Sequence, residues 1–301
     1  MFQYVLTPLS GRPNFIRWSL LKKFLRSLCL LKRVLKSVVE RTFLQLNFDE
    51  KDLSEQLGFS FREEHGKILL VVKKGTPYYH RHASRLIEDE VLLDLENARR
   101  KLEQVGDYVV YSVYNLWKSV DFFKELYRKT GLLGDLTLLN QGFFSFHDGG
   151  ELFFTYGHAH EAFLGELYMV LKNKCFLILS DRKSFQTFVV WLNEGDAFFI
   201  HPDYMHRMTV YKKDCLFLTL APEKAGHDYL CVKAKGFPVS LFYNAEKKRV
   251  EIKRNPKFTA TYRVVKNVKK IDAVKLVRDD PEKLKQILEN PENYLDFYFR
   301  G

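Results

Sequence analysis

The chain has 301 residues, of which 46% are hydrophobic and 15% aromatic, so it is long enough to bury a core in one or two domains. It contains no run of about 18 uncharged apolar residues and no clear secretory signal, which argues against a membrane span and leads us to expect a cytoplasmic protein. The net charge of +11 at first suggests a nucleic acid partner. However, residues 1–47 hold nine Lys or Arg and a single acid, Glu40, so most of the excess charge lies in one segment and we expect no nucleic acid.

That basic segment has the pattern of an amphipathic helix over residues 16–46. Its apolar residues recur at spacings of three and four, namely Leu21, Phe24, Leu25, Leu28, Leu31, Leu35 and Val38. Such a helix can attach to an anionic membrane surface or an acidic partner, or it can pack its apolar stripe on the barrel or on a second subunit. We favour packing, although the segment can also be an extension with little bearing on the chemistry. We treat residues 1–56 as a helical extension.

Short strands dominate the rest of the chain. A β-rich run covers residues 66–72, and a charged helical stretch covers 84–104. Beyond Tyr108, β-branched and aromatic runs predict strands over residues 109–114, 136–139, 152–156, 167–171, 176–179, 188–192, 197–200, 207–211 and 216–220. Many short strands at this spacing favour a closed barrel or jelly roll. We expect a barrel domain over residues 57–260 and a C-terminal extension over 261–301, in which Asp280-Pro281 opens a short helix.

A group of candidate metal ligands follows one of these predicted strands. His158 and His160 are two residues apart, so on a strand both imidazoles point to the same face. Glu166 comes after a turn-like stretch, and a hairpin there would bring its carboxylate beside them, with Tyr168 on the same face. His206 supplies a third imidazole. Three His and one Glu suit Fe, Mn, Zn or Ni and leave positions open for substrate oxygens.

The complete spacing carries more information than the His pair alone. H-x-H, five residues, Glu, a turn, G-D and then P-x-x-x-H on a strand-rich background is the two-part signature of the cupins. The turn falls at Asn173, where that pattern usually has glycine, and asparagine tolerates the left-handed conformation. We interpret a second H-x-H, His80-Arg81-His82, as a solvated basic turn because no glutamate follows in hairpin register. The four cysteines are widely spaced, and we expect them to be core thiols.

Several stretches resemble one family more closely, the cupin-type glucose-6-phosphate isomerases. The similar stretches are Glu151 to His160, Glu166-Leu167-Tyr168, His206-Arg207 and, most specifically, Ala225-Gly226-His227-Asp228-Tyr229. The resemblance covers about residues 57–258, and the basic helix before it has no counterpart in the compact members of the family. It implies a mainly β cupin fold, a double-stranded β-helix or jelly-roll barrel, with an added N-terminal helical segment.

The resemblance also implies roles for individual residues. It assigns metal binding to His158, His160, Glu166 and His206, catalysis to Glu166, Tyr168 and His227, and substrate binding to Tyr111, Thr137, Thr155, Gly157 and Tyr229. By residue type alone, His227 and the tyrosines would equally serve as structural residues. One departure concerns Ala221, because the family has a tyrosine at this position. The loss of that phosphate donor would weaken affinity or change the substrate.

The implied function is a metal-dependent isomerase that interconverts glucose 6-phosphate and fructose 6-phosphate, in glycolysis and gluconeogenesis. We expect one divalent metal ion and favour iron over manganese, zinc or nickel. Glu166 is the candidate base for proton transfer between C1 and C2, unless a hydride shift leaves it mainly a ligand. The alternatives are another cupin sugar-phosphate enzyme, which Ala221 would suit, and a non-catalytic sugar-phosphate-binding cupin. By analogy with the family we expect a homodimer.

Overall fold

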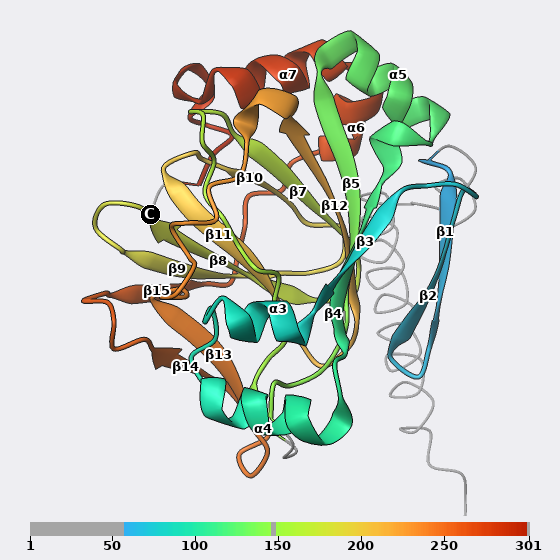
Figure 1. Cartoon of the computed structure of the whole chain (residues 1–301). Helices are drawn as coiled ribbons and strands as arrows, with labels where there is room; N and C mark the ends of the chain where they lie inside the picture. The colour runs from blue at the N-terminus through green and yellow to red at the C-terminus, as the bar shows by residue number, and fades with distance from the viewer. Residues whose placement is uncertain (1–56, 146–148, 300–301) are drawn as a thin grey trace, which may run out of the picture. The chain divides into compact units, whose positions relative to one another are not determined.

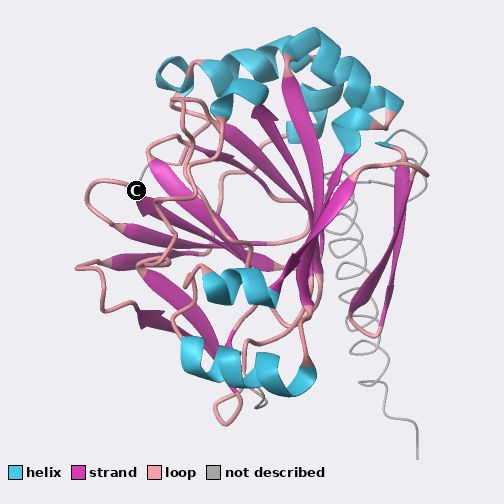
Figure 2. Ribbon diagram, viewed as in Figure 1, coloured by secondary structure: helices cyan, strands magenta, loops and turns pink. Residues whose placement is uncertain are grey.

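The computed structural model describes residues 57–145 and 149–299 of the chain. The predicted helix over residues 16–46, and Cys29 within it, lie outside these residues. The described part is mainly β, and its strands form sheets of six, four, three and two strands (Figures 1 and 2).

The six-stranded sheet is antiparallel throughout, in the order β10-β7-β12-β5-β4-β3. Its strands are β3 (Tyr78–His82), β4 (Val109–Asn115), β5 (Leu132–Leu139), β7 (Glu166–Lys172), β10 (Ala197–Ile200) and β12 (Cys215–Pro222). The strands predicted in these regions are confirmed. The interpretation of His80-Arg81-His82 as a turn is wrong, because all three residues lie in β3 and pair with β4. β3 lies at the edge of the sheet, where charged side chains are readily accommodated.

The four-stranded sheet has the order β11-β8-β9-β15. Its strands are β8 (Cys175–Asp181), β9 (Thr187–Leu192), β11 (Tyr204–Val210) and β15 (Tyr262–Val265), of which β15 runs parallel to β9. The smaller sheets contain β1 (Phe59–Glu64) with β2 (Lys67–Val72), and β6 (Gly150–Glu151) with β13 (Val239–Asn244) and β14 (Arg249–Arg254). β15 lies beyond residue 260, and its pairing with β9 makes it part of a sheet of the barrel.

The predicted strand over residues 152–156 is not a regular strand. Leu152 N–H donates to Leu241 O, Phe153 N–H to Gly142 O and Thr155 N–H to Met208 O. Because the segment changes its partner almost residue by residue, it forms isolated bridges rather than a continuous ladder.

Along its central strands, both faces of the six-stranded sheet are buried, each in a different hydrophobic core. On β7, Tyr168 and Val170 face a core shared with β8, β9 and β11 of the four-stranded sheet. The alternate residues Leu167 and Met169 face a second core, which the helices at the top of Figure 1 complete. This explains why β7 reads as a continuous apolar run instead of alternating.

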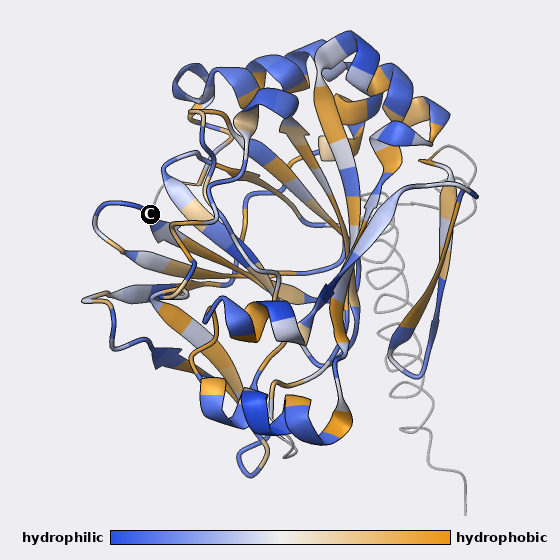
Figure 3. Ribbon diagram, in the orientation of Figure 1, coloured by the Kyte–Doolittle hydropathy of each residue, from blue (hydrophilic) through white to orange (hydrophobic). Residues whose placement is uncertain are grey.

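Five α-helices are described. They are α3 (Ala83–Glu88), α4 (Leu95–Val105), α5 (Asp121–Thr130), α6 (Ala273–Asp279) and α7 (Pro281–Glu289). α3 and α4 divide the predicted helical stretch, because Glu90 has a left-handed φ of 50°. α7 begins as predicted, with Pro281 in its first turn and the Asp280 carboxylate accepting from Lys283 N–H at 3.1 Å. α5 and α7 alternate hydrophobic and hydrophilic residues (Figure 3) and bury Phe123, Leu126, Leu284, Ile287 and Leu288 in the second core.

The predicted mainly β architecture of the cupin type is therefore confirmed, with two facing sheets around one buried core. Short 3₁₀ turns complete the described elements, namely η1 (Leu116–Lys118), η2 (Glu223–Ala225) and η3 (Pro291–Tyr294). Cys175 and Cys215 are free and buried, and Cys231 is free and partly buried. Among the helices of residues 57–145 and 149–299, none combines the length and apolar character that crossing a membrane requires.

Candidate active site

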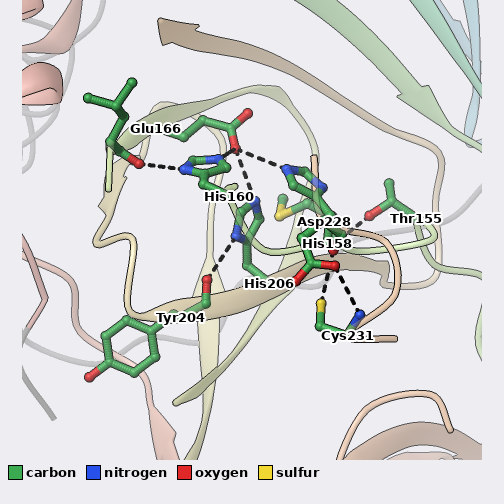
Figure 4. A network of polar contacts seen from close by, with 10 residues as sticks. Thr155, His158, His160, Glu166, Tyr204, His206, Asp228 and Cys231 are labelled. Carbon is green, nitrogen blue, oxygen red and sulfur yellow. Dashed lines mark hydrogen bonds and ion pairs between the residues drawn. The ribbon is translucent and has the colours of Figure 1, made fainter. Parts of the chain in front are cut away.

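Glu166 and three histidines converge between the two large sheets (Figure 4). Glu166 Oε2 lies 3.0 Å from His206 Nε2, 3.3 Å from His160 Nε2 and 3.7 Å from His158 Nε2. The candidate ligand atoms of the four residues all lie within 4.8 Å of one another. The structure thus brings together the four residues that the sequence singled out, as a group able to hold a metal ion.

The backbone places three of these side chains. Glu166 is the first residue of β7, in the six-stranded sheet, whereas His206 belongs to β11, in the four-stranded sheet. His158 forms an antiparallel bridge with His206, in which each N–H donates to the other residue's carbonyl, at 3.1 and 2.8 Å. The site therefore spans both sheets, and a main-chain pair fixes two of its imidazoles.

The imidazoles of His160 and His206 are oriented by backbone carbonyls. His160 Nδ1 lies 2.5 Å from Leu164 O, and His206 Nδ1 lies 3.5 Å from Tyr204 O. A proton on Nδ1 would satisfy these carbonyls and leave the Nε2 lone pairs directed at the centre of the group, as in protein metal sites. His158 Nε2 is buried and has no hydrogen-bond partner among the described residues. A set of three nitrogens and one carboxylate oxygen with an unsatisfied buried nitrogen fits a divalent metal ion.

The charges of Glu166 and His158 agree with this fit. At His160, burial would lower the pKa of the imidazole, but the contact with Glu166 outweighs burial and raises it. Burial alone would raise the pKa of Glu166, but contacts from His160 and His206 outweigh it and hold this pKa well below its ordinary value. Burial, together with the neighbouring His206, lowers the pKa of His158 well below its ordinary value. An ionised carboxylate beside a neutral imidazole is the protonation state in which these groups bind metals.

A pocket opens next to this group. Its lining includes nine of the predicted site residues, which are Tyr111, Thr137, Thr155, Gly157, His158, Glu166, Tyr168, His227 and Tyr229. His160 and His206 are each 1% exposed and are not among the lining residues. Ala221 also lines the pocket, so the position where the family has a tyrosine faces the same space. The roles of these residues stay predictions.

The loop after β12 contributes His227 and Tyr229. The His227 ring centre lies 4.3 Å from that of His158, and the Tyr229 ring centre lies 5.2 Å from that of Tyr156. Between them, Asp228 pairs with Ala159 through two backbone hydrogen bonds of 2.8 and 3.1 Å. This pairing holds the loop beside the segment that carries His158 and His160. Burial lowers the pKa of His227, so its imidazole is neutral near pH 7.

The floor of the pocket is a polar row that crosses the six-stranded sheet. Asp135 on β5 pairs with Thr219 on β12, which in turn pairs with Tyr168 on β7. All three residues line the pocket. Asn115 Nδ2 donates to Asp135 Oδ1 at 2.9 Å, and burial raises the pKa of Asp135 to about 6. Tyr168 is buried, and its ring stacks on Phe217 at 5.6 Å.

Sequence reasoning missed Asp135, Thr219 and Tyr79 as lining residues. A signal existed for Asp135, because it lies two residues before Thr137 on one strand and must face the same side. Tyr79 and Thr219 required the register between strands, which a single sequence does not contain.

Comparisons with known proteins agree with this site. The family model described as glucose-6-phosphate isomerase matches residues 84–258. The chain is 32% identical over 165 residues to the glucose-6-phosphate isomerase of Thermococcus litoralis, an alignment that covers 54% of this chain and 80% of that protein. It is 33% identical over 157 residues to that of Thermococcus onnurineus, which covers 51% of this chain and 75% of the relative.

Among solved structures, a Bacillus subtilis oxalate decarboxylase is similar with a TM-score of 0.28 and 14% identity, over 36% of this chain and 24% of that one. This likeness is too low to bear on function. The family model spans more than half of the chain, and the alignment with the Thermococcus litoralis protein covers most of that relative. The chain therefore belongs to the glucose-6-phosphate isomerase family.

Proposed function

We propose that this chain interconverts glucose 6-phosphate and fructose 6-phosphate at the pocket beside His158, His160, Glu166 and His206, with the aid of one divalent metal ion. The observation that carries the proposal is the convergence of the four ligand atoms within 4.8 Å at the edge of a pocket lined by hydroxyl groups. Membership of the family supports the choice of substrate.

The four residues would hold the metal ion through three imidazole nitrogens and one carboxylate oxygen. A bound divalent ion would supply Lewis-acid polarisation of two neighbouring sugar oxygens. This donor set suits iron, manganese, zinc and nickel alike, and we favour iron.

Glu166 is our candidate for the base. All three imidazole contacts involve Oε2, and Oε1 takes part in no hydrogen bond or ion pair among the described residues, although Glu166 lines the pocket. Oε1 would accept the proton from C2 of the open-chain aldose and return it to C1 of a cis-enediol, while the hydroxyl proton of O2 passes to O1, which yields the ketose. In the alternative, hydrogen moves from C2 to C1 as hydride and Glu166 serves only as a ligand.

Tyr168 and His227 would orient the sugar. Burial raises the pKa of Tyr168 well above its ordinary value, so its hydroxyl stays protonated and can donate a hydrogen bond to a sugar oxygen. His227, neutral and next to His158, would exchange a proton with O5 as the ring opens. Tyr229, 37% exposed, would contact the substrate at the mouth of the pocket.

The phosphate would bind at Thr155, Gly157, Tyr111 and Thr137. The Thr155 hydroxyl accepts from Met208 N–H at 3.0 Å, which leaves its own hydrogen to donate. Gly157 has φ +82°, and a Cβ there would lie 2.5 Å from the Phe237 ring. Its N–H makes no hydrogen bond to the described residues, so a phosphate oxygen can reach a free backbone donor.

A second candidate function, isomerisation of a related phosphorylated sugar, is favoured by two lining residues. Ala221 removes the hydroxyl that the family has, and Asp135 places a carboxylate on the pocket floor. Both residues would affect which sugar hydroxyls are held.

The test is a coupled assay of fructose 6-phosphate conversion with chelator-treated protein, to which iron, manganese, zinc or nickel is added back. We expect metal to restore turnover and Glu166→Gln to lower kcat by about 100- to 10,000-fold. Metal binding without turnover on either hexose phosphate would contradict the isomerase and point to another substrate or to a non-catalytic sugar-phosphate-binding protein.

For the whole protein we propose a homodimer in the cytoplasm that acts in glycolysis and gluconeogenesis, with residues 1–56 as an extension outside the chemistry. We keep residues 57–260 as the catalytic domain and 261–301 as a C-terminal extension. The family match supports the bounds of the catalytic domain, because the matched residues 84–258 fall within it.

A further inference from the structure

We propose that Arg81, on the edge strand β3, is the cation that binds the phosphate group of the substrate, and that it acts together with Tyr111. The inference rests on the proposed function, since it concerns the same pocket and a phosphorylated substrate.

The pocket lining is negatively charged, which favours a nearby cation for binding a phosphate. The charged carboxylates in the lining are Asp135, Glu166 and Glu223, and no Lys or Arg appears among the described lining residues. A phosphate monoester brings about two further negative charges near neutral pH. The proposed metal ion offsets the charge of Glu166, whereas the hydroxyl and N–H groups proposed to bind the phosphate are neutral. A cation just outside the lining would lower the cost of burying the phosphate charge.

Arg81 is the side chain in position to do so. It pairs with Tyr111 across β3 and β4, which lie side by side in Figure 1. Its Nε donates to Tyr111 Oη at 3.3 Å, and its guanidinium carbon lies 5.7 Å from the Tyr79 ring centre and 5.6 Å from that of Tyr156. All three tyrosines line the pocket, so the guanidinium lies at its rim.

The alternation of β3 fixes this direction. His80, the neighbour of Arg81, points to the opposite face, where its Nδ1 lies 2.7 Å from Ser112 Oγ. Arg81 is half-buried and forms no ion pair with a carboxylate among the described residues. Four of its five N–H donors are thus available to a bidentate anion such as phosphate.

Arg81 also orients the Tyr111 hydroxyl. Tyr111 Oη accepts from Arg81 Nε and from Tyr156 N–H, both at 3.3 Å. With these two acceptor positions occupied, the hydroxyl hydrogen is left to donate into the pocket, close to Thr155 and Gly157. One residue therefore supplies both positive charge and a directed hydroxyl donor for the same anion.

The alternative is that Arg81 only stacks on the tyrosines and supports β3. Two ligands separate the two roles, 6-phosphogluconate and gluconate, because they differ only by the phosphate. Their binding to the metal-loaded full-length protein is measured by calorimetry for wild type, Arg81→Ala and Arg81→Lys. Arg62→Ala serves as the matched control, since it removes the same charge from β1, where Arg62 contacts Glu64 at 3.2 Å and is exposed.

We expect Arg81→Ala to weaken binding of 6-phosphogluconate by about 10- to 100-fold and to leave gluconate within twofold, because a hydrogen bond to a charged group is lost. Arg81→Lys should fall between wild type and Arg81→Ala, since it keeps the charge but not the two-pronged geometry. Arg62→Ala should match wild type.

Three results would overturn the proposal. They are unchanged 6-phosphogluconate affinity in Arg81→Ala, an equal loss for both ligands, and a wild type that binds the two ligands equally. The isomerase proposal is tested independently of Arg81. If binding of 6-phosphogluconate depends on Arg81 but the protein does not turn over hexose phosphates, the phosphate site stands and the isomerase proposal is wrong. If the protein turns over hexose phosphates but binding does not depend on Arg81, the isomerase proposal stands and the role of Arg81 is wrong.

Discussion

Two buried glutamates, Glu151 and Glu166, show how similar side chains serve different ends. Glu151 is fully buried and Glu166 is 4% exposed. The Glu151 carboxylate accepts from Leu93 N–H, Asp94 N–H and the Ser240 hydroxyl, so both of its oxygens are satisfied by the protein. Glu166 instead faces imidazole nitrogens whose lone pairs converge on the same space. The Glu151 carboxylate therefore needs no ligand, whereas the Glu166 group leaves lone pairs that a ligand can satisfy.

The neighbouring residues His206 and Arg207 on β11 contribute to these two different groups. His206 joins the Glu166 group, while Arg207 points to the opposite side, where its Nη2 donates to Ser240 Oγ at 2.9 Å and to Val239 O at 3.1 Å. The Arg207 guanidinium carbon lies 3.9 Å from the Phe154 ring centre. Arg207 Nε and Nη1 have no hydrogen-bond partner among the described residues, so its positive charge is balanced by Glu151 and the ring of Phe154 rather than by a full set of hydrogen bonds. The difference between the two groups is therefore that the Glu151 carboxylate is satisfied by protein donors, whereas the Glu166 group directs several lone pairs at one point.

Removing the Glu151 carboxylate would test this division most strongly. We expect Glu151→Ala to lower the free energy of unfolding by about 3–5 kcal/mol, because it leaves Arg207 buried without a compensating charge. Urea unfolding followed by circular dichroism measures the loss. Turnover per folded molecule should stay within twofold of wild type, in contrast to Glu166→Gln. A variant that is as stable as wild type but inactive would break the comparison.

Asp135 lies between the two cases, since one oxygen is satisfied by Asn115 and the other is open to the pocket. Its pKa is about 6 in the folded state, above the ordinary 3.8. Between these values the carboxyl ionises more readily in the unfolded chain, so its contribution to stability is lost as the pH rises through about 6.

Asp135→Asn should therefore be more stable than wild type at pH 7.5, by at most about 3 kcal/mol, and by only about 1 kcal/mol at pH 4.5. Urea unfolding of chelator-treated protein at the two pH values gives the comparison. An equal difference in unfolding free energy at the two pH values would mean that burial does not raise the pKa of Asp135.

The smallest expected effect on stability is at the start of α7, away from the groups around Glu151 and Glu166. Asp280→Ala removes the cap that accepts from Lys283 N–H and should cost about 1 kcal/mol of unfolding free energy. The control is Asp279→Ala, whose partner Arg278 is exposed, and it should cost less than about 0.5 kcal/mol. Thermal unfolding distinguishes the two. A loss as large as that of Glu151→Ala would remove the contrast between buried networks and surface elements.

The candidate metal ligands and most strands were predictable from local patterns. The spacing of His158, His160 and Glu166 fixes their relative directions over a few residues, even though the segment before His158 is not a regular strand. α5 was not anticipated, although its buried Phe123 and Leu126 are three residues apart and Gly131 ends it in a left-handed conformation. That signal was local and available.

Arg81 was misread for a different reason. The stretch His80-Arg81-His82 was interpreted as a solvated basic turn because no glutamate follows in hairpin register, and only pairing with Tyr111 reveals which face Arg81 occupies. Register between strands far apart in the sequence depends on the whole barrel, so residues such as Arg81 and Thr219 could not be placed from local pattern.

The main-chain bridge between His158 and His206 has a consequence for how such a site can change over time. The two hydrogen bonds belong to the backbone and would survive replacement of either imidazole. Single substitutions can therefore add, lose or exchange ligands while the scaffold that presents them persists. During evolution, a barrel built in this way can change its metal preference, or lose metal binding, while the protein stays folded.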